Sequence, residues 1–226
     1  MKRCTLILLI SFQCLHATDV LFMEDFSGNL LQNWTMFGDP QPRILDSLGI
    51  PPPCFNNNGD SMGGSGVISR EIFEIANGLG VECDMYLSCE NRGTWVTAGL
   101  YFITPDYIND RSHSGYVISA LAFSYSGEMD WTHPHLQGVL YLNCIPNHDD
   151  RFSVQLYHQN ELLDGWHRYR LEIDEHRMVN YFIDDSLYCT STVSIPDTLE
   201  HVRLQLGNRS SSWGIALHDN LIVYRP

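Results

Sequence analysis

The sequence predicts an all-β fold in which two antiparallel sheets pack against each other as a sandwich. Residues 165–173, 179–187 and 216–224 alternate apolar and polar side chains, which is the period of strands with one buried face. Aromatic residues make up 12% of the chain, and aromatic side chains favour strands. Helical patterns are confined to short turns at 72–77 and 107–110. With 226 residues, the chain suits one sandwich domain, since such folds run to about 200–250 residues.

The beginning of the chain has the pattern of a secretory signal peptide. A basic start, Lys2-Arg3, precedes the apolar stretch 6–12, and a plausible cleavage site ends at Ala17. The apolar stretch is too short to span a bilayer. We therefore expect a signal peptide over 1–17, one domain over 18–226, and a secreted protein that is extracellular or periplasmic.

The net charge of the chain is strongly negative. Its formal value is −14, with 27 acidic residues against 13 basic ones. Such a chain repels phosphate backbones, so nucleic-acid binding is not expected, and no basic patch favours anionic polysaccharides. The carboxylates suit a hard cation such as calcium.

The remaining strands are expected at regular intervals between turn-forming residues. Residues 38–66 are rich in Gly, Pro and Asn and are expected to form one long loop, preceded by Trp34 as an anchor. The other expected strands are 20–26, 67–69, 80–87, 95–102, 116–123, 138–142, 152–157, 193–196 and 202–206.

Five cysteines remain once the predicted signal peptide is set aside. They are Cys54, Cys83, Cys89, Cys144 and Cys189. In an oxidising compartment, one or two disulfides are expected, with one thiol left unpaired. The spacing does not define which cysteines pair.

The order of these elements resembles the concanavalin A-like lectin/glucanase superfamily, and within it the LamG-like and family 16 glycoside hydrolase jelly rolls. The resemblance extends from Phe22-Met23-Glu24-Asp25-Phe26 to Asp219-Asn220-Leu221-Ile222-Val223-Tyr224. Its most specific parts are the 166–187 hairpin, Ile195-Pro196 and the final strand. It implies a two-sheet jelly-roll sandwich that handles sugars.

The resemblance also implies a structural calcium ion that ties the first strand, an early loop and the last strand together. The matching positions are Asp219 through its carboxylate, Asp25 through a carbonyl or its side chain, and Gly59 through a carbonyl. Calcium accepts mixed oxygen ligands of this kind. Alternatively, Asp219 only begins a strand and Gly59 only forms a turn.

A hydrolytic site is suggested by residues 126–133. Family 16 enzymes carry Glu-x-Asp-x-Glu or Glu-x-Asp-x-x-Glu, and Glu128 and Asp130 match the nucleophile and the aspartate that tunes it. The second glutamate is absent, with His133 at the longer spacing. Histidine can move protons near neutral pH, but a retaining glycosidase needs two carboxyl groups about 5–5.5 Å apart. Catalysis through Glu128, Asp130 and His133 is therefore an alternative hypothesis.

A lyase of the same superfamily is a weaker alternative. Residues 155–158, Gln-Leu-Tyr-His, have suitable side chains. They lack a flanking arginine pattern, and the acidic chain disfavours a polyuronate substrate.

Sugar binding needs only aromatic platforms and hydrogen-bonding groups on an exposed sheet. The expected platforms are Trp95, Tyr101, Trp131 and Trp213. Trp166, Tyr169 and Phe182 are expected to belong to the core.

The sequence thus predicts a secreted, non-catalytic β-sandwich that binds a polysaccharide or another glycan. The first alternative is a divergent β-glucan hydrolase that uses Glu128 and Asp130. The second is a structural or adhesive extracellular domain without a glycan site.

Overall fold

The computed structural model describes residues 19–39, 41–57, 64–87, 96–106, 117–125, 138–144, 152–158, 165–208 and 216–226. The predicted signal peptide lies outside these residues. Within them, no helix is both long enough and apolar enough to cross a membrane.

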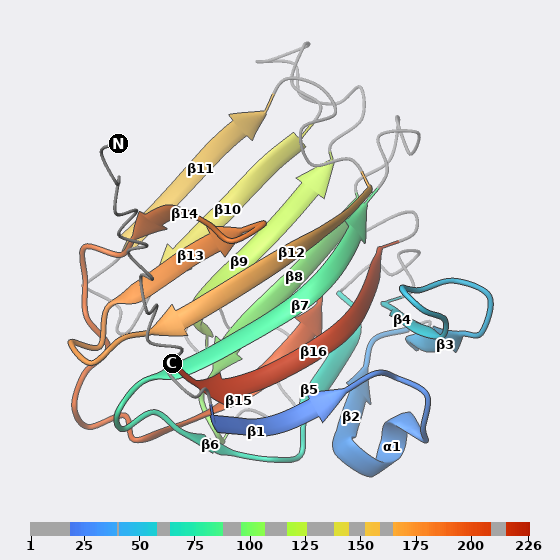
Figure 1. Ribbon diagram of the computed structural model, residues 1–226, viewed down its shortest axis with the longest axis horizontal. Helices are drawn as coiled ribbons and strands as arrows, with labels where there is room; N and C mark the ends of the chain where they lie inside the picture. The colour runs from blue at the N-terminus through green and yellow to red at the C-terminus, as the bar shows by residue number, and fades with distance from the viewer. Residues whose placement is uncertain are drawn as a thin grey trace, which may run out of the picture.

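The described chain forms two antiparallel sheets that lie face to face, with sheet A in front of sheet B in Figure 1. The strands of sheet A, in spatial order, are β14 (Ser186–Thr190), β13 (Val179–Ile183), β12 (Gly165–Ile173), β7 (Leu79–Leu87), β16 (Leu217–Arg225), β4 (Cys54–Asn56) and β3 (Arg43–Leu45), with β1 (Asp19–Glu24) also paired to β16. The strands of sheet B are β11 (Phe152–His158), β10 (Gly138–Cys144), β9 (Val117–Tyr125), β8 (Val96–Ile103), β15 (His201–Gly207), β5 (Gly66–Ser69) and β2 (Trp34–Phe37), with β6 (Phe73–Glu74) also paired to β15. The predicted two-sheet sandwich is confirmed.

The alternation seen in the sequence sorts side chains between the core and the outer face of each sheet. In β12, Tyr169, Leu171 and Ile173 are buried in the core, whereas Arg170 and Glu172 between them are only partly buried. The same period is found in β13 and β7. Burial of the apolar set drives the two sheets together, since each buried aliphatic side chain contributes about 1.5–3 kcal/mol.

Two polar contacts cross the core between the sheets. The Ser119 hydroxyl of sheet B lies 3.2 Å from the Tyr181 hydroxyl of sheet A. His218 of sheet A, fully buried, places Nε2 3.2 Å from the Gly99 carbonyl oxygen of sheet B. These contacts satisfy polar groups that would otherwise be costly to bury.

The strand predicted over 193–196 is wrong. Residues 191–200 run as an irregular segment, and the strand that pairs with β13 is instead β14. The Arg177 guanidinium holds this segment by donating to the carbonyl oxygens of Ile195 (2.8 Å), Pro196 (2.6 Å) and Leu199 (2.5 Å). Proline cannot donate to a strand ladder, so side-chain donors replace strand pairing here.

Two further local predictions are wrong. Residues 38–66, expected to form one loop, contain the short strands β3 and β4. Residues 72–77 contain β6 instead of a helical turn, and residues 107–110 lie outside the described residues. A short helix, α1 (Leu30–Asn33), lies earlier in the chain, before β2, and the Asn29 side chain accepts a hydrogen bond from the Leu31 amide at its start. An asparagine at that position is a favoured N-cap.

The four described cysteines are free thiols, so the predicted disulfides are not confirmed. Cys54 lies on β4, Cys83 on β7, Cys144 on β10 and Cys189 on β14. Burial raises the pKa of Cys54 to about 11 and that of Cys144 to about 12. They therefore behave as small core side chains held in the protonated form. Cys89 lies outside the described residues.

Candidate functional site

The residues predicted from the sequence to form functional sites fall largely outside the part of the chain that the structure describes. These are Gly59, Trp95, Glu128, Asp130, Trp131, His133 and Trp213. The structure places Tyr101, Asp25 and Asp219, and it does not bring Tyr101 together with the other two.

Tyr101 lies on β8 and faces outward from sheet B. Its ring covers Gly99, where a β-carbon would collide with it. Tyr101 is only 5% exposed, in a buried apolar cluster with Ile68, Ile103 and Val117. The prediction that Tyr101 presents an open ring to a sugar is therefore not supported, because apolar neighbours enclose it.

Gln205 lies beside Tyr101 on the same outer face of sheet B. It sits opposite Tyr101 on β8 and opposite Ile68 on β5, and it is 1% exposed. Among the described residues, its Nε2 has no hydrogen-bond partner. A buried amide donor in this state costs about 1–3 kcal/mol.

Asp219, the predicted calcium ligand, is buried beside an irregularity in β16. Its Oδ2 accepts a hydrogen bond from the Ile50 amide (2.6 Å) and its Oδ1 from the Asn220 amide (2.8 Å). Burial raises the pKa of Asp219, while these two amides act to lower it. Asp25 is exposed, and hydrogen bonds from the Ser27 hydroxyl and amide lower its pKa.

The described residues contain no assembled calcium site. Both carboxylate oxygens of Asp219 already accept backbone N–H groups, and Asp25 binds Ser27. Within the described chain, no three His, Cys, Asp or Glu side chains gather where they could hold a metal ion. Asp219 instead anchors the segment between β3 and β4 to the irregular part of β16.

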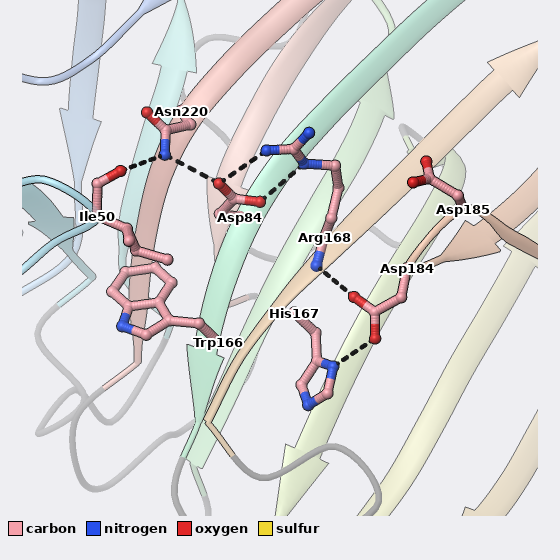
Figure 2. A pocket seen from close by; sticks show the side chains of 8 residues that line it. All are labelled: Ile50, Asp84, Trp166, His167, Arg168, Asp184, Asp185 and Asn220. Carbon is pink, nitrogen blue, oxygen red and sulfur yellow. Dashed lines mark hydrogen bonds and ion pairs between the residues drawn. The ribbon is translucent and has the colours of Figure 1, made fainter.

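A hollow of about 460 Å³ opens on the outer face of sheet A (Figure 2). Its lining comes from β7, β12, β16, the β13–β14 turn and the segment before β4. The lining residues are Ile50, Asp84, Trp166, His167, Arg168, Asp184, Asp185 and Asn220. The volume is typical of small-molecule sites, which measure about 300–1,000 Å³.

Strand register brings an aromatic pair and an ion pair to this hollow. Trp166 on β12 lies opposite Tyr86 on β7, and Arg168 lies opposite Asp84. The Trp166 and Tyr86 rings have centroids 5.5 Å apart at an angle of 50°. Tyr86 thereby supports Trp166 from one side, and Trp166 remains only partly buried.

Arg168 is fixed by a two-point contact. Its Nε donates to Asp84 Oδ1 (2.9 Å) and its Nη2 to Asp84 Oδ2 (3.2 Å). The hydrogen bond to Asp84 raises the pKa of Arg168. Asn220 Nδ2 also donates to Asp84 Oδ2 (2.9 Å) and to the Ile50 carbonyl oxygen (2.8 Å). Paired contacts of this kind hold a guanidinium in one orientation.

The Asp184-Asp185 turn forms the other side of the hollow. Both residues have positive φ, 48° and 62°, as in the tight hairpin turns that suit twisted strands. Asp184 accepts a hydrogen bond from the Arg168 amide (3.0 Å), and its Oδ2 lies 2.6 Å from His167 Nδ1. The exposed Asp185 carboxylate has no hydrogen bond or ion pair with a described residue. The acidic turn predicted from the sequence is confirmed.

The core assignment of Trp166 and Phe182 is wrong, and that of Tyr169 is confirmed. The buried positions of β12 are odd-numbered near Tyr169, and Trp166 has the opposite parity, so it faces outward. Phe182 likewise faces outward on β13, under the Arg170 guanidinium at 4.0 Å. Parity counted from Tyr169 places Trp166 on the outer face from the sequence alone, whereas the face of Phe182 also depends on the register of β13 with β12.

Sequence comparison finds no protein family whose model matches this chain, and no curated protein that matches significantly. Comparison of structures does find similar proteins. A family 16 glycoside hydrolase from the mixed-linkage glucan locus of Bacteroides ovatus, in complex with a glucan product, has a TM-score of 0.58 at 12% identity. The match covers 90% of this chain and all of that one.

Two other solved structures represent the same fold. The β-glucanase of Bacillus licheniformis has a TM-score of 0.53 at 13% identity, over 91% of this chain and 97% of that one. The potassium-bound carbohydrate recognition domain of Emp46p has a TM-score of 0.56 at 10% identity, over 88% and 92%. The chain has the concanavalin A-like jelly-roll fold. At these identities the likeness concerns the fold, which both lectins and glucanases use.

Proposed function

We propose that this concanavalin A-like domain binds carbohydrate in the hollow on the outer face of sheet A. The observation that carries the proposal is the position of Trp166 beside a fixed set of polar groups in one open hollow (Figure 2). Trp166 offers a flat apolar ring for the face of a sugar, and carboxylates and amides bind the hydroxyl groups around it.

The hydrogen bonds within the hollow favour binding with little rearrangement. Arg168 is held by Asp84, and Asp184 is held by the Arg168 amide and His167. Side chains that are already fixed lose little entropy when a ligand arrives. Asp185 remains available to accept hydrogen bonds from sugar hydroxyls.

We further propose that the protein is secreted and acts without catalysis. Its predicted signal peptide supports secretion. In the hollow, the carboxylates of Asp84 and Asp184 serve to fix Arg168 and His167, which supports a binding role over acid–base chemistry. Trp95, Trp131 and Trp213 remain proposed platforms of a second surface.

Hydrolysis through Glu128 and Asp130 is the second candidate function. It is favoured by the glucanases among the proteins of similar structure, one of which is described in complex with a glucan product.

The test is a glycan array combined with a reducing-sugar assay on the same protein preparation, with variants Trp166→Ala, Trp95→Ala and Glu128→Gln. We expect Trp166→Ala to weaken the affinity for the glycan at least tenfold, since the sugar loses its stacking on the ring and is no longer positioned for its hydrogen bonds. Trp95→Ala reports on the second surface and is expected to leave binding in the hollow unchanged, and no sugar is expected to be released.

Three outcomes would contradict the proposal. If Trp95→Ala removes binding while Trp166→Ala does not, the site lies elsewhere. If reducing sugar is released and Glu128→Gln abolishes the release, the protein is a hydrolase. If the array shows no glycan bound, the structural or adhesive alternative stands.

A further inference from the structure

The side chains that line the hollow carry an excess of negative charge. Among the described residues of its lining, Asp84, Asp184 and Asp185 face a single arginine, Arg168. The carboxylates among these residues therefore outnumber the arginine by two. The chain as a whole has a formal net charge of −14. The potential at this surface therefore favours a cation over an anion.

The one arginine in the hollow does not offset this excess for an incoming ligand. Its guanidinium binds Asp84 at two points and lies 3.8 Å from Glu82. Asp185 is exposed and has no hydrogen bond or ion pair among the described residues. Asp184 lies 2.6 Å from His167 Nδ1, so the least compensated carboxylate is that of Asp185, on the side of the hollow opposite Trp166 in Figure 2.

The aromatic wall adds a preference for a ligand with a flat apolar face. Trp166 is partly exposed and stands against Tyr86, with its ring at the edge of the hollow. The face of an indole ring packs against the apolar face of a sugar ring. A ligand that carries both an apolar sugar face and an amine would use the two walls of the hollow together.

From the charge, the ring and the shape of the hollow, we infer that its ligand is an amino sugar with a free, protonated amine. This inference rests on the proposed carbohydrate-binding function. One sugar ring lies against Trp166, and the ammonium group of the same or the next ring lies toward Asp184 and Asp185. Uronates and sulfated sugars are excluded by repulsion from the same carboxylates.

The test compares oligosaccharides of equal length by isothermal titration calorimetry on the full chain. The probes are oligomers of glucosamine, N-acetylglucosamine, glucose and galacturonate. We expect glucosamine oligomers to bind about tenfold more tightly than the N-acetylated and neutral ones, and galacturonate oligomers not to bind. The preference should shrink when the salt concentration rises from 50 to 500 mM, since salt screens exposed charges.

The variant Asp185→Asn tests the charge with almost no change of shape. Asparagine tolerates the positive φ at this position, so the turn should fold. We expect the affinity for glucosamine oligomers to fall about fivefold, with the affinity for glucose oligomers unchanged. The matched control is Glu175→Gln, which removes an exposed carboxylate at the far end of β12 and should change neither affinity.

The outcomes separate this inference from the proposed function. If neutral oligomers bind as well as glucosamine oligomers and Trp166→Ala abolishes both, the inference is overturned and the carbohydrate site stands. The inference is also overturned if Asp185→Asn leaves the glucosamine preference intact. If no oligomer binds at all, the proposed function itself fails.

Discussion

The outer faces of the two sheets differ sharply, although both are built from the same alternating strands. Sheet A presents paired polar side chains, with Arg170 over the Phe182 ring and the Tyr224 hydroxyl 2.5 Å from Glu172, and it carries an open hollow. Sheet B presents a buried apolar cluster around Tyr101. An outward-facing aromatic residue is therefore a candidate ligand platform on one sheet and a packing residue on the other.

This difference teaches that strand parity and solvent exposure are separate properties. Trp166 and Tyr101 both point outward from their sheets. Trp166 keeps part of its ring accessible, whereas Tyr101 is 5% exposed. The alternation of a strand decides the face of a side chain, and tertiary contacts decide whether that face meets solvent.

Replacing one aromatic residue on each face should give the largest contrast. We expect Tyr101→Ala to lower the free energy of unfolding by about 3–5 kcal/mol, since it leaves a cavity in a packed cluster. Trp166→Ala should lower it by about 1 kcal/mol, because its ring is only partly buried. Urea denaturation measures both values. Equal losses for the two variants would mean that the two faces are packed alike.

His218, which is buried between the sheets, should make the stability of the protein depend on pH, whereas an exposed histidine should not. Burial lowers its pKa to about 4, from an ordinary value of 6.5. As the pH falls through 6.5, the unfolded chain binds a proton at this histidine that the folded chain does not bind. The free energy of unfolding therefore has its full value above pH 6.5 and decreases as the pH falls from 6.5 to about 4. The loss is about 3 kcal/mol in total.

The measurement for His218 is urea denaturation at pH 7.0 and 5.0 of the wild type, His218→Gln and His176→Gln. His176 is exposed, so its replacement should leave the pH dependence unchanged. His218→Gln should flatten it, because glutamine does not titrate. An unaltered pH dependence in His218→Gln would show that other groups cause the loss.

On sheet A, the variant Asp219→Ala distinguishes two roles of Asp219, which are to anchor the segment around Ile50 and to coordinate calcium. Removal of the carboxylate leaves the partly buried Ile50 amide without its acceptor, which should cost about 1 kcal/mol. The melting temperature of the wild type should not change with EDTA or with millimolar calcium. A melting temperature that calcium raises in the wild type, but not in Asp219→Ala, would restore the calcium hypothesis.

On sheet B, the smallest expected effect is an increase in the free energy of unfolding, whereas the other variants lower it. Gln205→Leu removes an amide donor that has no partner among the described residues and keeps a similar volume. We expect the free energy of unfolding to stay the same or to rise by up to about 1 kcal/mol. A loss of more than 1 kcal/mol in urea denaturation would indicate that the amide of Gln205 makes a stabilising hydrogen bond.

Much of the fold could be predicted because it depends on the local periodicity of the sequence. The β12–β13 hairpin, its Asp184-Asp185 turn and the final strand follow from alternation and turn chemistry alone. The strand expected over 193–196 failed because a short apolar run does not reveal that Arg177 will bind its carbonyl groups. Contacts of that kind join residues whose neighbourhood in space is unknown until the chain folds.

The candidate site was harder to predict. Trp166 was assigned to the core on its aromatic character, although its parity relative to Tyr169 places it outside. Asp84 and Asn220 carried no local signal, because they come from strands 136 residues apart and meet only through the pairing of β7 with β16.

By itself, the sequence determined a two-sheet sandwich, the position of its hairpin turn and an acidic surface, since each depends on residue type and near-neighbour spacing. Only the tertiary structure decided which outward face is open, and that Trp166, Arg168 and the Asp184-Asp185 turn share one hollow. The physical reason is that strand alternation is local, whereas register and sheet-on-sheet packing bring distant residues together. The same packing left Asp219 as a loop anchor and Tyr101 as a buried side chain.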